Sequence, residues 1–254
     1  MAQRPLDPTA WVQRLVGRLG PEDVERVNRA LLVSIDEVSA RRWEAAKARA
    51  AGLPGDLRPE KIGALTTAMS RELAAAGAAA GAAAASPLVG LGMTVMSATV
   101  ELGWFTLRAG DLILTIAALH GRPEPTVDER RAWVLAVLLF GGSARDGMAK
   151  AINQASTGLT PTPTTRLPVN TIQQVNRIFT RMLLRRYGTR RAAVALGTAL
   201  PLGVGALIGG SANYVAVQAL ARHADSFFSR LPYSAVETTS IEVGGALPPP
   251  MPLL

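Results

Sequence analysis

The chain of 254 residues contains no cysteine and only two histidines, His120 and His223. The absence of cysteine excludes a disulfide framework and thiol catalysis, and two histidines alone disfavour a histidine-based metal site or catalytic triad. No HExxH motif, nucleophile elbow or P-loop occurs. The N-terminal twenty residues lack the apolar core of a secretory signal, so we expect a cytoplasmic protein. We predict no catalytic residue, no cofactor and no metal.

Acidic residues are missing between Asp146 and Asp225, where nine basic residues occur. The remainder of the chain is nearly balanced in charge, so this segment accounts for the net charge of +8. Such an asymmetry indicates an anionic partner, either membrane lipid or nucleic acid. Only Phe179 and Tyr187 accompany the arginines, and stacking on single strands needs more aromatic side chains. We therefore favour anionic membrane lipid over nucleic acid.

An amphipathic basic helix is predicted from about Val169 to Tyr187. Its apolar residues share one face and its arginines recur at every fourth position on the adjacent face. The predicted apolar face comprises Ile172, Val175, Phe179, Met182 and Leu183. The predicted membrane-binding or anion-binding residues are Arg177, Arg181, Arg185, Arg186, Arg190 and Arg191. A simply solvated face is the alternative, since most charged runs have that role.

Two long uncharged runs extend from Leu73 to Val100 and from Ala192 to Ala221. Each exceeds the roughly twenty residues that cross a bilayer, but a central helix of a bundle reads the same way. Pro201 and the many glycines make a lone span doubtful. Small residues at every fourth position instead predict close helix packing. The predicted packing positions are Gly77, Gly81, Gly205, Gly209, Gly210 and Asn213.

The predicted fold is an all-α, multi-helix bundle with closely packed Ala/Gly-rich helices and an extended C-terminal tail. Helical patterns extend from Pro21 to about Ala51 and again from Glu60. Asp111 lies among apolar residues, where a carboxylate needs a partner such as Arg108 or a helix N-terminus. These two residues form a candidate polar site. A helix cap after Gly110 is the alternative interpretation for Asp111.

We divide the chain into an N-terminal helical segment (1–58), a helical domain (59–232) and a tail (233–254). A Thr/Pro-rich stretch over residues 151–168 is either an internal boundary or a long surface loop. The tail has β-branched residues and then Pro248 to Pro250, a composition suited to docking on a partner protein. A disordered terminus is the alternative. Homo-oligomerisation stays open.

Two blocks of sequence resemble the bacterial EcsC protein family. The first is RAGDLILTIAALHGRPEPTVDERRAWVLAVLLFGG, with an Asp before an apolar helix, an acidic turn and a second apolar helix. The second is RMLLRRYGTRRAAVALGTALPLGVGALIGGSANYVAVQALARHADSFFSRL. The likeness covers residues 62–231. His120 departs from the family, where an aromatic Tyr is usual, and the long alanine tract is this chain's own.

The resemblance implies helical architecture and membrane association but no reaction, because the family has no settled biochemical activity. We therefore expect a non-enzymatic protein on the inner (cytoplasmic) membrane, docked peripherally through the basic segment or partly inserted through glycine-rich helices. One alternative is a soluble scaffold or adaptor that recruits a partner through residues 233–254. Another is an enzyme with a carboxylate site near Asp111.

Overall fold

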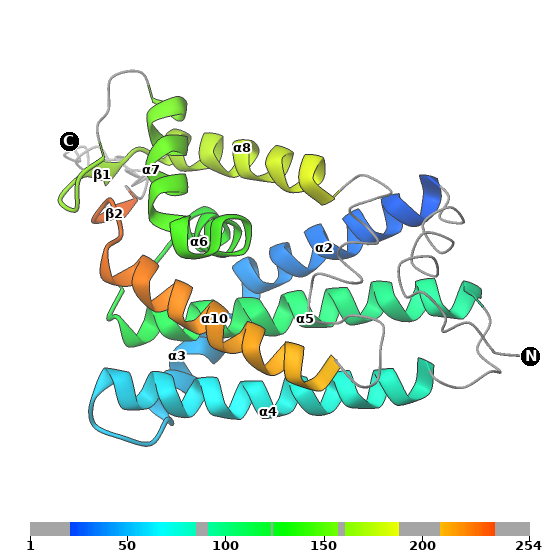
Figure 1. Cartoon of the computed structure of the whole chain (residues 1–254). Helices are drawn as coiled ribbons and strands as arrows, with labels where there is room; N and C mark the ends of the chain where they lie inside the picture. Colours follow the sequence, from blue (N-terminus) through cyan, green and yellow to red (C-terminus); the bar gives the residue numbers. More distant parts are fainter. Residues whose placement is uncertain (1–20, 85–90, 123, 157–160, 188–208, 237–254) are drawn as a thin grey trace, which may run out of the picture.

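The structure is a computed structural model that describes residues 21–84, 91–122, 124–156, 161–187 and 209–236. Most of these residues are helical, which confirms the predicted all-α, multi-helix bundle (Figure 1). The elements in chain order are α2 (Pro21–Arg41), α3 (Trp43–Ala51), α4 (Arg58–Ala84), α5 (Leu91–Leu119), α6 (Val127–Phe140), the 3-10 turn η1 (Gly141–Ser143), α7 (Ala144–Ala155), β1 (Arg166–Leu167), α8 (Val169–Tyr187), α10 (Gly209–Ser229) and β2 (Ala235–Val236).

Local signals in the sequence set several helix ends. Pro21 occupies the first position of α2, where a missing N–H costs nothing. The Thr126 side chain accepts a hydrogen bond from the Glu129 N–H at 3.2 Å and so caps α6. Gly141 ends α6 with a φ of 54°, a conformation that glycine adopts readily. The helical pattern that extends to Ala51 is divided at Arg42, which separates α2 from α3.

Helix α5 occupies the centre of the bundle. It contacts α2, α3, α4, α6 and α10, and its residues Ile113, Leu114 and Ile116 are fully buried. The window Leu102–Leu119 is the one stretch of the described helices that is long and apolar enough to cross a membrane, with a mean hydropathy of 1.4. Two thirds of this window, 67%, is buried inside the bundle, and a core helix has the same length and composition as a span.

Helices α2 and α5 approach each other closely at Gly110. A Cβ atom at this position would lie 2.5 Å from Val38 Cγ1, far inside van der Waals contact. Glycine is therefore required by the helix-to-helix distance, since its φ is ordinary for a helix. Close helix packing thus occurs at a glycine that was not among the positions predicted from small residues at every fourth position.

The alanine-rich helix α4 packs against α10, and the two helices lie antiparallel in the bundle (Figure 1). Gly77 and Gly81 belong to α4, whereas Gly209, Gly210 and Asn213 lie in the first turns of α10. Gly205 lies outside the described residues. The two helices that carry the predicted packing positions therefore contact each other. The side chains around these positions lie outside the described part.

Helices α6, α7 and α8 pack together at one end of the bundle. The Thr/Pro-rich stretch begins within α7 and ends at β1, so it connects two helices that contact each other. Strand β1 pairs in parallel with β2, with Arg166 opposite Ala235 and Leu167 opposite Val236. Residues 233–236 of the tail therefore pack on the helices. Residues 237–254 lie outside the described part.

One hydrophobic core connects the N-terminal helices with the rest of the bundle. Ile35 and Val38 of α2 and Trp43 of α3 belong to the same buried cluster as Trp133 of α6 and Phe228 of α10. The rings of Trp43 and Trp133 meet edge to face with centroids 6.4 Å apart. Residues 21–51 thus share their core with the helices from α4 onward.

Candidate functional site

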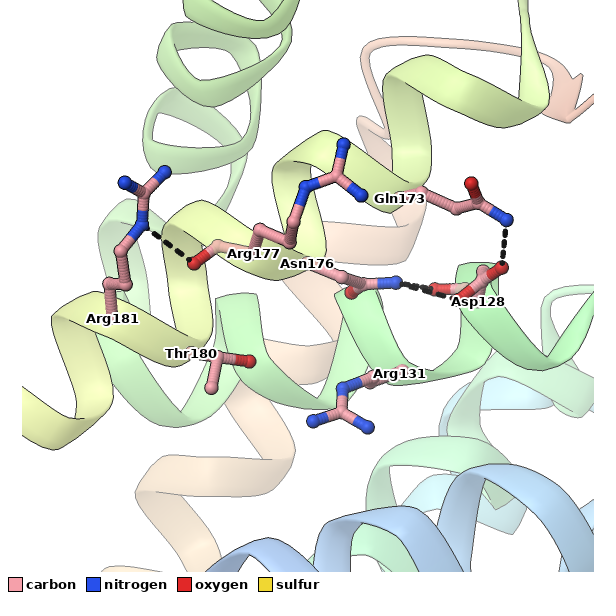
Figure 2. Close-up of a pocket in the computed structure, with 7 residues that line it drawn as sticks. All are labelled: Asp128, Arg131, Gln173, Asn176, Arg177, Thr180 and Arg181. Carbon is pink, nitrogen blue, oxygen red and sulfur yellow. Dashed lines mark hydrogen bonds between the residues drawn. The ribbon is translucent and has the colours of Figure 1, made fainter.

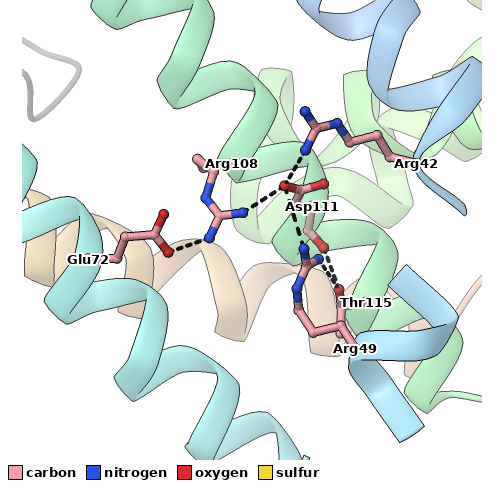
Figure 3. A network of polar contacts seen from close by, with 6 residues as sticks. All are labelled: Arg42, Arg49, Glu72, Arg108, Asp111 and Thr115. Carbon is pink, nitrogen blue, oxygen red and sulfur yellow. Dashed lines mark hydrogen bonds and ion pairs between the residues drawn. The ribbon is translucent and has the colours of Figure 1, made fainter. Parts of the chain in front are cut away.

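The predicted pair of Asp111 and Arg108 lies at the centre of a larger ionic network (Figure 3). Asp111 Oδ2 accepts hydrogen bonds from Arg108 Nη1 at 2.9 Å and from Arg42 Nη1 at 3.0 Å. Arg49 Nη2 lies 3.9 Å from the same oxygen. Three guanidinium groups from two parts of the chain therefore surround one carboxylate.

The alternative interpretation of Asp111 as a helix cap is wrong. Asp111 lies in the interior of α5 and is completely buried. A carboxylate in that position keeps its charge only with ionic partners, because burial without them costs several kcal/mol. The arginines of α3, α5 and the α2–α3 junction supply those partners.

Further contacts extend the network to α4 and along α5. Arg108 also pairs with Glu72 of α4, and Arg49 Nη1 donates to Thr115 Oγ1 at 3.2 Å. The Thr115 hydroxyl in turn donates to the main-chain oxygen of Asp111 at 2.6 Å. Asp111 is completely buried and held by three arginines, so this arrangement suits an ionic junction between helices better than acid–base chemistry.

A second buried acid, Glu129, was not recognised in the sequence. Its pKa is raised to about 7 by burial, although hydrogen bonds from the Tyr233 hydroxyl and the Thr126 N–H favour the charged form. The Tyr233 hydroxyl also accepts a hydrogen bond from Trp133 Nε1 at 2.7 Å. The spacing of Thr126 and Glu129 is that of a capping box, which could have revealed this residue.

Tyr233 connects the start of the tail to α6 through these contacts. Its side chain is 1% exposed, and burial raises the pKa of its hydroxyl. A buried hydroxyl needs partners, and Trp133 and Glu129 are those partners. These contacts therefore have a structural role, because they attach residues 233–236 to α6.

The two histidines occupy separate environments. His120 Nε2 lies 2.8 Å from Asp225 Oδ1, which links the end of α5 to α10. Burial lowers the pKa of His120, and Asp225 opposes that shift. The His223 ring instead lies against Gly141, 3.1 Å from where a Cβ atom of that residue would be. Among the described residues, no group of three or more His, Cys, Asp or Glu side chains is arranged to hold a metal ion.

Helix α8 has the amphipathic character that the sequence predicts. Ile172, Val175, Phe179 and Leu183 are buried, whereas Met182 is 40% exposed and so departs from the predicted apolar face. The side chains of three predicted anion-binding residues are exposed, namely Arg177, Arg181 and Arg185. Arg186 belongs to α8 but its side chain is not described, and Arg190 and Arg191 lie outside the described residues.

A surface groove of about 790 Å³ lies between α8 and α6 (Figure 2). It is lined by two of the predicted arginines together with residues that the sequence did not indicate. The lining residues are Asp128, Arg131, Gln173, Asn176, Arg177, Thr180 and Arg181. Only the tertiary contact of α6 with α8 brings these residues together, since they lie about fifty positions apart in the chain.

No family model, no curated protein and no solved structure matches the chain. The resemblance to the EcsC family therefore stays a prediction from the sequence.

Proposed function

We propose that the chain is a non-enzymatic, EcsC-like helical protein that docks on the anionic cytoplasmic surface of the bacterial membrane through α8. The observation that supports this proposal is the row of exposed arginines Arg177, Arg181 and Arg185 along one face of that helix. Successive members stand four residues apart, so their guanidinium groups project on the same side.

The arginines of this row have no acidic partner among the described residues. Arg177 Nε donates to the neutral Gln174 Oε1 at 3.1 Å, and Arg181 Nε donates to the main-chain oxygen of Arg177 at 3.3 Å. By contrast, exposed arginines on α2 pair with glutamates, as Arg29 does with Glu25. The positive charge of α8 is therefore available to an external anion.

Two neighbouring side chains favour a membrane over a nucleic acid. Phe179, the aromatic residue within the arginine row, is fully buried and cannot stack on a base. Met182 is instead exposed beside Arg181, where its thioether side chain could enter the boundary between head groups and acyl chains. A basic helix with an apolar edge is typical of interfacial helices.

Vesicle flotation tests the proposal with the variant Arg177→Gln/Arg181→Gln/Arg185→Gln. Each arginine near an anionic surface contributes about 1 kcal/mol, so three replacements should weaken binding roughly a hundredfold. The matched control is Arg29→Gln/Arg41→Gln/Arg71→Gln, which removes the same charge from exposed positions of α2 and α4. The control should retain most of the binding.

Three results would contradict the proposal. The parent protein could fail to float with anionic vesicles at physiological salt. The α8 variant and the control could lose binding equally, which would indicate a diffuse effect of net charge. The parent protein could also bind single-stranded or duplex nucleic acid more tightly than vesicles under the same salt conditions.

A further inference from the structure

The groove between α8 and α6 contains hydrogen-bond acceptors as well as cations. Asp128 of α6 lies beside Asn176 and Gln173 of α8, while Arg177 and Arg181 lie further along α8 (Figure 2). Arg131 lines the groove from α6. A carboxylate does not help a surface that only attracts anions. Asp128 therefore indicates a ligand that carries hydrogen-bond donors as well as a negative charge.

The amides of α8 hold the Asp128 carboxylate in place. Gln173 Nε2 donates to Asp128 Oδ2 at 3.2 Å, and Asn176 Nδ2 donates to the Asp128 main-chain oxygen at 2.8 Å and to Oδ1 at 3.3 Å. A carboxylate has about four lone-pair positions, so two stay available. Asp128 can therefore accept hydrogen bonds from a ligand without losing its own.

Asn176 supplies a second acceptor in the same place. Its side chain is 6% exposed, and its Oδ1 is buried without a hydrogen-bond partner in the described part of the chain. A buried amide oxygen without a partner costs about 1–3 kcal/mol in proteins, which is the loss that a bound donor removes. The acceptor end of the groove thus suits a group that carries O–H donors.

The other end of the groove suits a phosphate. Arg177 and Arg181 retain N–H donors beyond those given to Gln174 and to the main chain, and guanidinium groups bind phosphate oxygens well. Thr180 lies one helical turn after Asn176 and adds a hydroxyl on that side of α8, beside the acceptors (Figure 2). Arg131 pairs with Asp36 through Nη1, and its Nε has no hydrogen-bond partner in the described part of the chain.

We infer that the groove binds the head group of phosphatidylglycerol, with the phosphodiester on Arg177 and Arg181 and the glycerol hydroxyls on Asp128 and Asn176. The inference rests on the proposed function, because it names the lipid that the docking face selects. The Asp128 carboxylate repels a bare phosphate, so inorganic phosphate and phosphatidic acid fit the groove less well. A head group that separates its phosphate from its hydroxyls avoids that repulsion.

The test uses vesicles of phosphatidylcholine that contain about 30 mol% of either phosphatidylglycerol or phosphatidylmethanol. The two kinds of vesicle then have the same surface charge. Both anionic lipids carry one phosphodiester charge, and only phosphatidylglycerol carries hydroxyls. We expect the parent protein to bind phosphatidylglycerol roughly tenfold more tightly, the gain from hydrogen bonds to a charged acceptor. Asp128→Asn should reduce that preference to less than about threefold.

Asp146→Asn is the matched control, because it removes an exposed acid of α7 outside the groove and should leave the preference unchanged. If Asp128→Asn melts at a lower temperature than the parent, Thr180→Val provides a second variant inside the groove with nearly the same side-chain shape. It should also lower the preference for phosphatidylglycerol.

The outcomes separate the two proposals. Equal binding of the parent to both anionic vesicles overturns the head-group inference and leaves membrane docking intact, whereas no binding to either overturns both. A retained preference in folded Asp128→Asn and Thr180→Val also overturns the inference. Saturable binding of soluble glycerol 3-phosphate without preference between the vesicles would assign the groove to a soluble ligand and overturn the lipid assignment.

Discussion

Replacing Asp111 with asparagine should destabilise the bundle through its ionic network. The substitution keeps the size of the side chain but removes the charge that Arg42, Arg49 and Arg108 share. Loss of one partner from a buried ion pair costs about 3–5 kcal/mol. These arginines are 33%, 29% and 19% exposed, so water compensates in part and we expect the lower end, about 3 kcal/mol.

Urea denaturation followed by circular dichroism measures this loss, and melting should fall by roughly 6–12 °C for a chain of this size. Glu25→Gln is the control, since it breaks an ion pair whose partners are both 70% exposed and should cost less than about 1 kcal/mol. In the Asp111→Asn background, Arg42→Gln should cost less than in the parent, because its partner is already gone. A cost of Asp111→Asn no greater than that of Glu25→Gln, or additive costs of Asp111→Asn and Arg42→Gln, would show that the network does not stabilise the bundle.

Three further predictions concern the core and the attached tail. Burial raises the pKa of Glu129 from 4.5 to about 7, so the folded state holds the proton more tightly than the unfolded state and stability should fall by about 3 kcal/mol as pH rises through that interval. Urea midpoints across the interval test this, and a Glu129→Gln variant with the same pH dependence would contradict it. Gly110→Ala should cost about 1–3 kcal/mol in thermal unfolding because its Cβ meets Val38, and an unchanged melting temperature would show that α2 and α5 can separate freely. Tyr233→Phe should cost about 1–3 kcal/mol because Trp133 Nε1 loses its acceptor, and a stability equal to that of the parent would mean that the hydroxyl adds nothing.

Much of the secondary structure could be predicted from local patterns. The helix predicted from Pro21 begins there, and Thr126 and Gly141 mark helix ends through hydrogen bonding and φ preference within a few residues. The buried face of α8 follows from helical periodicity, with Met182 as the exception. The helix break at Arg42 was missed, because no proline or glycine marks it in the sequence.

Only half of the candidate site could be predicted from the sequence. The arginines of α8 stand out because charge and spacing are properties of the sequence, and three of them are exposed as such a pattern predicts. The acceptors Asp128 and Asn176 did not stand out, since a lone Asp or Asn has no pattern of its own. They acquire a common role only where the start of α6 meets α8.

The sequence by itself determined the helical class, the segregation of positive charge and the face of α8 that carries it, because these depend on interactions within a few turns of one helix. The tertiary structure decided the partners of Asp111, the burial of Glu129 and the attachment of Tyr233 to Trp133. Each of these depends on contacts between helices distant in the chain. Burial makes such contacts decisive, since a polar group removed from water is stable only beside the partner that the fold supplies.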